Sequence, residues 1–301
     1  MLLRIAPFLF VLLWSTGFIG SKVGAEYAEP FTFLTIRFAL VLALLIPWAL
    51  LTRIHWPARP VAWQAAVTGT LIHTIYLGGV MWALRDHMPA GIVAIVVSTQ
   101  PILTALLAGP VLGEWPGRQH WIGLICGLVG VLLVLAPKLS FQAATTESFG
   151  IAALVGVFGA LVGMTLGTLN QKMHGMSGDL LAVTIWQYVA AFITSAAAAL
   201  ASETMIVQWT PEFVAATAWL VIVLSIGAIL LLMVMIRASA VSRVTSLFYL
   251  VPATTALMAA AMFGEELSYL QMTGIALVMA AVFVIRPMAG RTQVPSHSRR
   301  S

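Results

Sequence analysis

The residues of this sequence that could do chemistry are few, and several of them interrupt long apolar segments. His73 lies near the middle of one such segment. If that segment is helical, Thr70 and Thr74 share its face and Tyr76 adjoins it. Polar groups in an apolar segment are costly and usually face a protein interior. We expect His73, Thr70 and Tyr76 to hydrogen-bond a polar ligand, and the alternative is a histidine satisfied by a neighbouring helix.

Two prolines lie in stretches that match each other at an offset of 151 residues, QPILTALLAGPVLGEWPG from 100 to 117 and VPATTALMAAAMFGEELS from 251 to 268. Pro101 and Pro252 each free a backbone carbonyl four residues back. In lipid that carbonyl must face protein or water. We therefore expect both kinks to border a cavity and to act as hinges, the alternative being packing kinks. The other residues expected to line this cavity are Trp14, Ser98, Gln100, Asn170 and Tyr249.

The composition indicates whether the chain folds in water or in a membrane. The chain is 61% hydrophobic and 8% charged, with a mean hydropathy of +1.01, whereas soluble domains are about 25% charged. It is therefore expected to be an all-α integral membrane protein. A crossing needs about 20 apolar residues, which predicts ten spans. They are placed at 3–22, 31–51, 62–84, 90–111, 119–136, 150–171, 180–201, 213–236, 242–263 and 269–286.

The positions of lysine and arginine predict the orientation. With a cytoplasmic N-terminus, eleven basic residues fall on the cytoplasmic side and three on the other, as the positive-inside rule requires. Five spans per half is an odd number, so the matching halves enter the membrane from opposite faces. We expect an inverted repeat of residues 1–140 and 145–287, followed by a disordered cytoplasmic tail, 288–301, with both termini cytoplasmic.

The residues also resemble a known family. WSTGF at 14–18, Lys22, the spacing from Pro30 to Arg37 and the repeated Gly-Glu pairs with Glu114 and Glu265 are similar to the drug/metabolite transporter superfamily, EamA type. The second half departs from the pattern, with Met164 and Gln187 in the places of Trp14 and Arg37. The resemblance implies export of amino acids or related metabolites across a bacterial inner membrane.

Absent motifs narrow the chemistry further. The sequence has no nucleotide-binding loop, no metal-ligand spacing and no catalytic set, so we expect no enzyme, cofactor or metal. Basic residues are not clustered, so no nucleic-acid partner is expected. The predicted partners are the lipid bilayer and a small-molecule substrate, and the sequence leaves open whether the chain forms a homodimer.

The missing intramembrane carboxylate guides the choice of substrate. An exporter of lipophilic cations generally needs an Asp or Glu inside the membrane, and all ten acidic residues lie at span ends or in loops. The sequence therefore favours a transporter of neutral or zwitterionic metabolites that works by alternating access. The alternatives are a proton-coupled multidrug exporter and a non-transporting receptor or scaffold. Glu114 and Glu265 are expected to anchor helix ends.

Overall fold

The computed structural model describes residues 2–88, 90–143, 150–174, 178–263 and 267–284, and nearly all of them are helical. The predicted all-α class is confirmed. The only pairing of extended backbone within these ranges is one antiparallel bridge between Ala28 and Val207. The uninterrupted helices are α1 (Leu2–Tyr27), α2 (Pro30–Thr52), α7 (Arg118–Ala143), α8 (Ile151–His174), α9 (Leu180–Ser202) and α14 (Tyr269–Val284).

The remaining helices form four broken rods. The first is α3 (Arg59–Gly69), the π-helical η1 (Thr70–Tyr76) and α4 (Leu77–Arg85), and the second is α5 (Ala90–Ser98) and α6 (Gln100–Leu112). The third and fourth rods are α10 (Pro211–Trp219) with the π-helical η2 (Leu220–Ala228) and α11 (Ile229–Ala238), and α12 (Val241–Ser246) with the 3₁₀ turn η3 (Leu247–Tyr249) and α13 (Leu250–Phe263).

The chain is a multi-pass membrane protein. Seven helical stretches within the described ranges are long and apolar enough to cross a bilayer, and α1 and α14 contain the shorter apolar stretches Ile5–Gly17 and Tyr269–Val282. Each predicted span overlaps a helix or a broken rod. Length and composition do not establish all ten crossings, so the ten-span count stays a prediction.

The breaks recur at matching places in the two halves. The π segments η1 and η2 start 150 residues apart, at Thr70 and Leu220. Thr99, between α5 and α6, and the 3₁₀ turn before α13 both come just ahead of a proline, Pro101 and Pro252. Prolines and π segments are the usual causes of helix kinks. The chain therefore departs from regular α-helical geometry at matching places in the two halves.

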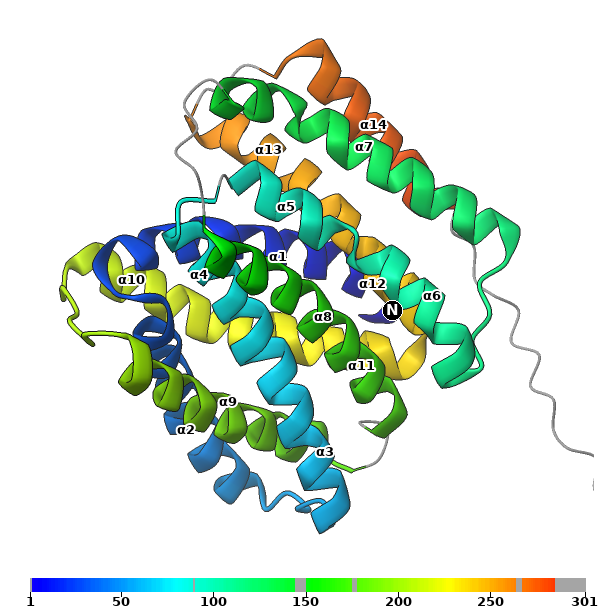
Figure 1. Cartoon of the computed structure of the whole chain (residues 1–301). Helices are drawn as coiled ribbons and strands as arrows, with labels where there is room; N and C mark the ends of the chain where they lie inside the picture. The colour runs from blue at the N-terminus through cyan, green and yellow to red at the C-terminus, as the bar shows by residue number, and fades with distance from the viewer. Residues whose placement is uncertain (1, 89, 144–149, 175–177, 264–266, 285–301) are drawn as a thin grey trace, which may run out of the picture.

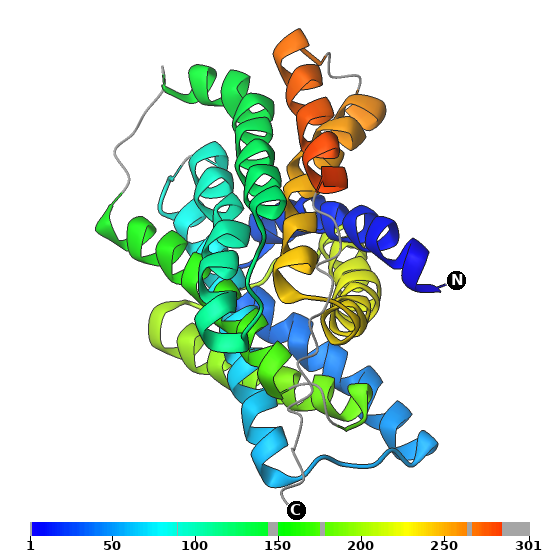
Figure 2. The same ribbon diagram turned by 90° about the vertical axis from the view of Figure 1, so that its right-hand side faces the viewer.

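Two helix pairs lie at opposite edges of the bundle. α7 packs along α14 at one edge and α2 packs along α9 at the other (Figures 1 and 2). Between them, α1 contacts α13 and the α10–η2–α11 rod, and α8 contacts α6 and the α3–η1–α4 rod. The broken rods thus lie in the middle of the bundle, where protein surrounds their irregular backbone.

Glycines allow several pairs of helices to approach closely. A Cβ added to Gly163 of α8 would lie 2.8 Å from the carbonyl oxygen of Leu71, and one added to Gly274 would lie 2.7 Å from that of Gly130. A Cβ on Gly69 would overlap the backbone of Gln187. Membrane helices associate through such contacts because lipid provides no hydrophobic drive between them.

Gly69→Ala should therefore destabilise the protein, and Gly159→Ala should not. Overpacking costs about 1–3 kcal/mol, whereas a Cβ on Gly159 meets no atom within 4 Å and Ala favours a helix. We expect a lower melting temperature in detergent for Gly69→Ala alone. Equal melting temperatures for both variants would contradict the close approach of α3 and α9.

Candidate functional site

A cavity of about 950 Å³ runs from one end of the bundle into its centre. We call that end the Glu29 end, because its rim includes Glu29 and Arg85, and the opposite end the Lys172 end. The deepest polar residues in the cavity wall are Arg37 of α2, His73 of η1 and Tyr188 of α9. Most of the remaining wall is apolar. The volume is within the usual range for small-molecule sites, about 300–1,000 Å³.

Arg37 is a charged side chain enclosed by the bundle, with 4% of its surface exposed. Its Nε donates to the Ser225 hydroxyl at 2.8 Å, and the Tyr188 hydroxyl donates to the Ser225 carbonyl at 2.5 Å. Among the described residues, none places a carboxylate within ion-pair distance of Arg37, and its terminal nitrogens make no hydrogen bond. Since Arg37 lines the cavity, these donors are available to a ligand.

His73 lies beside this guanidinium. Its ring stacks on Tyr188 with centroids 4.5 Å apart and an interplanar angle of 16°, and Phe38 lies 5.8 Å away. The side chain is 2% exposed, and its Nε2 has no hydrogen-bond partner in the described part of the chain. The stacking fixes the ring, so a second unsatisfied polar atom is held at the same depth.

A smaller cavity of about 260 Å³ adjoins the first. Its wall includes Ser98, Gln100 and Pro252 and shares Trp14 and Tyr76 with the larger cavity. Gln100 donates to the Thr104 hydroxyl at 2.9 Å. The break before Pro252 therefore borders a cavity, and Pro101 is buried without lining either one.

The other predicted cavity residues lie elsewhere. Asn170 donates to the Gln64 carbonyl at 3.0 Å and the Thr68 hydroxyl at 2.8 Å, so it joins α8 to α3. Thr70 is half-buried outside both cavities. Tyr249 is fully buried in an apolar cluster with Leu124.

Sequence reasoning missed two residues of the site, Arg37 and Ser225. Arg37 appeared only as part of a family pattern, although its charge within an apolar segment was a usable signal. Ser225 carried no comparable signal, and nothing in the sequence placed Tyr188 beside Arg37. They reach the site because α9 and η2 pack against α2.

Residues 4–136 match the EamA-like transporter family. The first part of the chain is thus similar to transporters of this family. This match confirms the resemblance predicted from the sequence.

Relatives extend the similarity over most of the chain. An uncharacterised inner membrane transporter of Escherichia coli, YedA, is 26% identical over 93% of this chain and 89% of its own length. A probable amino-acid metabolite efflux pump of Salmonella typhimurium is 23% identical over 92% of both chains. A solved crystal structure with 20% identity has a TM-score of 0.76 and matches 94% of this chain and 97% of its own, which shows a shared fold.

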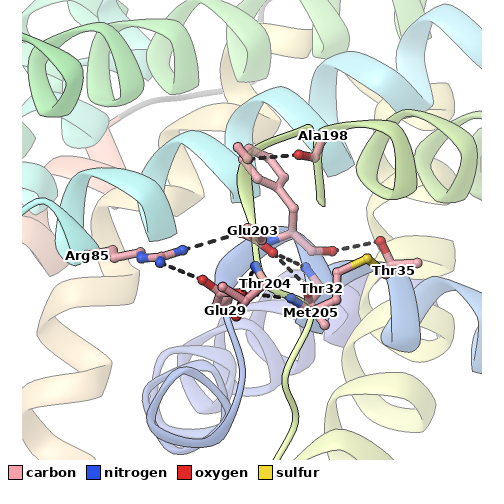
Figure 3. A network of polar contacts seen from close by, with 10 residues as sticks. Glu29, Thr32, Thr35, Arg85, Ala198, Glu203, Thr204 and Met205 are labelled. Atoms are coloured by element: carbon pink, nitrogen blue, oxygen red, sulfur yellow. Dashed lines mark hydrogen bonds and ion pairs between the residues drawn. The ribbon is translucent and has the colours of Figure 1, made fainter. Parts of the chain in front are cut away.

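Acidic side chains at the ends of the bundle cap helix N-termini that belong to other segments. Glu203 accepts from the N–H groups of Phe31 and Thr32, at 2.8 and 2.7 Å, where α2 begins (Figure 3). Asp86 accepts from Ala153 of α8 at 3.1 Å. The first N–H groups of a helix lack partners within it, and a carboxylate there also meets the positive end of the helix dipole.

At the Glu29 end, these caps join a polar network. Arg85 donates to Glu29 at 2.6 Å and lies 3.8 Å from Glu203 (Figure 3). The other oxygen of Glu29 accepts from the backbone N–H of Thr204 at 2.6 Å and of Met205 at 3.0 Å. The network ties α4 to the α1–α2 and α9–α10 connections at the rim of the cavity.

At the Lys172 end, a second ion pair closes the bundle. Lys172 lies 3.6 Å from Glu114 and donates to the carbonyls of Ile236 at 2.9 Å and Ser239 at 2.6 Å. Glu114 accepts from Val241 at the start of α12, at 2.8 Å. Four segments thus meet where the large cavity does not reach. In the sequence repeat, Lys22 corresponds to Lys172 and Glu265 to Glu114. The Lys22 side chain and Glu265 lie outside the described residues.

Within the described ranges, no group of three His, Cys, Asp or Glu side chains is arranged to hold a metal ion. The side chains of the cavity wall offer hydrogen bonding, charge and aromatic contact.

The Glu29 network should make stability depend on pH. Burial raises the pKa of Glu29, but hydrogen bonds from Thr204, Arg85 and Met205 outweigh that effect and hold the pKa below its usual value. A carboxylate with a lowered pKa stabilises the fold above its unfolded pKa of about 4.3 and loses that effect as the pH falls through the folded pKa. Glu29→Gln should lower the melting temperature at pH 7, and the difference from wild type should shrink below about pH 4.

Glu212→Gln is the matched control, because Glu212 is an exposed residue at the start of α10. It should change the melting temperature little at either pH. A Glu29→Gln difference that is constant from pH 7 to pH 3.5 would show that the carboxylate charge plays no part.

Proposed function

We propose that the protein is a secondary transporter that exports small neutral or zwitterionic metabolites, amino acids or related compounds, by alternating access. The observation that carries the proposal is the cavity, which is open at the Glu29 end and separated from the Lys172 end by the contacts of Lys172 and Glu114. A transporter needs such a state and its mirror image. The matched breaks at η1 and η2 support two halves that exchange these states.

The proposed orientation places the Lys172 end in the cytoplasm. The positive-inside count favours this orientation, and the inner-membrane assignment of YedA suits it. The described state is then open to the outside. Export is supported by the name of the Salmonella relative, a probable amino-acid metabolite efflux pump.

The chemistry of the cavity argues against the principal alternative. A proton-coupled exporter of lipophilic cations needs a carboxylate at membrane depth. The acidic residues of the cavity wall are Glu26 and Glu29, both at the rim, and the charged group deep inside is Arg37. A deep positive charge repels a cationic drug, so a metabolite with no net positive charge suits this cavity better.

Transport is tested by counterflow of radiolabelled phenylalanine and leucine in proteoliposomes. Wild type should accumulate label above protein-free liposomes. Ser21→Trp should reduce this signal at least tenfold, because Ser21 lines the cavity and an indole would obstruct it. Thr273→Trp, on the exposed face of α14, should transport normally. Absence of counterflow of both amino acids in wild type would refute this substrate class.

The orientation and the closed end are tested by labelling Ser21→Cys in a Cys126→Ser background. A membrane-impermeant thiol reagent should react from the outside, and Ser195→Cys, which is fully buried, should stay unreactive. Lys172→Met should slow the reaction severalfold, because the mirror state becomes more populated once the closing contacts weaken. Arg118→Gln, an exposed residue at the same end, should not. Reaction of Ser21→Cys only from the cytoplasmic side would reverse the orientation.

A further inference from the structure

We propose that Arg37 is the anchor for a substrate carboxylate, so that the deep part of the cavity selects monocarboxylates with an apolar body. The inference deepens the proposed function by assigning the recognised group to one residue. It rests on the position of Arg37, on its missing partner and on the walls around it.

The first step concerns charge. Arg37 lies seven residues after Pro30, the first residue of α2, which is about 10 Å along the helix axis at 1.5 Å per residue. Its side chain is 4% exposed. A guanidinium at that depth is costly unless it is paired. In the described part of the chain, its only hydrogen bond is to Ser225, a neutral hydroxyl. The charge is therefore balanced by water or by a ligand that enters the cavity.

The second step concerns geometry. Ser225 holds Nε, and the same residue accepts the Tyr188 hydroxyl, so the guanidinium is fixed from α9 and η2. The two terminal nitrogens remain, and they form the fork that fits the two oxygens of a carboxylate. His73 Nε2, also without a partner, lies at the same depth. A bound carboxylate would thus satisfy the guanidinium N–H groups that the protein leaves open.

The third step concerns the rest of the ligand. Above Arg37 the wall is formed by Trp14, Tyr76, Leu77 and Met81, which suit an apolar or aromatic body. The acidic side chains Glu26 and Glu29 lie only at the rim. No carboxylate of the wall is therefore placed to pair with an ammonium group beside Arg37, and the deep site requires a carboxylate without requiring an amine.

The repeat gives an internal comparison. Gln187 occupies the position in the second half that corresponds to Arg37, and its amide donates to Gln171 at 2.5 Å. That position is buried and lines neither cavity. Arg37 faces the cavity and is charged and unpaired, whereas its counterpart Gln187 is neutral and paired. This difference suggests that the charge of Arg37 serves to bind a ligand.

The test compares 3-phenylpropanoate with 3-phenylpropanamide, which share shape but differ in charge. Calorimetry on the full chain in nanodiscs should show at least tenfold tighter binding of the carboxylate to wild type. Arg37→Gln should remove this preference, because it should weaken binding of the carboxylate far more than binding of the amide. Arg118→Gln is the control and should keep it.

Equal affinity of wild type for both probes, or no binding of either, would overturn the proposal. This result needs no variant, so the proposal stays testable even if Arg37→Gln misfolds. Arg37→Lys should retain a weaker preference, because the charge remains and the fork is lost; retention of the full preference by Arg37→Gln would also overturn it. Counterflow is scored separately. A carboxylate preference without counterflow would refute the proposed transport function but not the role of Arg37. Counterflow without a carboxylate preference would refute the role of Arg37 but not the transport function.

Discussion

Everything in this structure depends on the cost of an unpaired polar group in hydrocarbon. Backbone groups can be satisfied within a helix, so the spans are helical. Side-chain hydroxyls follow the same constraint, as when Thr184 donates to Leu180 and Thr165 to Leu161, each at or below 2.8 Å. The helix ends are completed by carboxylates, of which Glu203 on α2 and Glu114 on α12 are the clearest.

Some of the departures from this constraint lie at the cavity. The π segment η1 carries His73, whose Nε2 has no partner in the described chain, and η2 carries Ser225, which holds Arg37. Irregular backbone and open donors are tolerated there because water or a ligand can reach them. Residues that look equally polar in the sequence, such as Asn170, are instead consumed in packing.

The two halves provide similar elements with different chemistry. Each half contains one rod with a π segment, followed by one rod that breaks before a proline. Their contacts differ at the functional positions, because Arg37 faces the cavity while Gln187 bonds Gln171. The elements of the two halves are therefore similar, whereas the side chains at these matching positions differ in charge and in contacts.

The sequence by itself determined the membrane class, the helical class, the approximate limits of the helices and the EamA resemblance, because hydropathy and proline placement act locally along the chain. Lys172 and Glu114 were recognisable as span-end residues for the same reason. The tertiary structure alone decided that Arg37, Tyr188 and Ser225 form one site and that Tyr249 and Asn170 do not belong to it. Which face of a helix meets a cavity depends on the packing of helices far apart in sequence, and in an almost uniformly apolar chain the hydrophobic pattern does not specify that rotation.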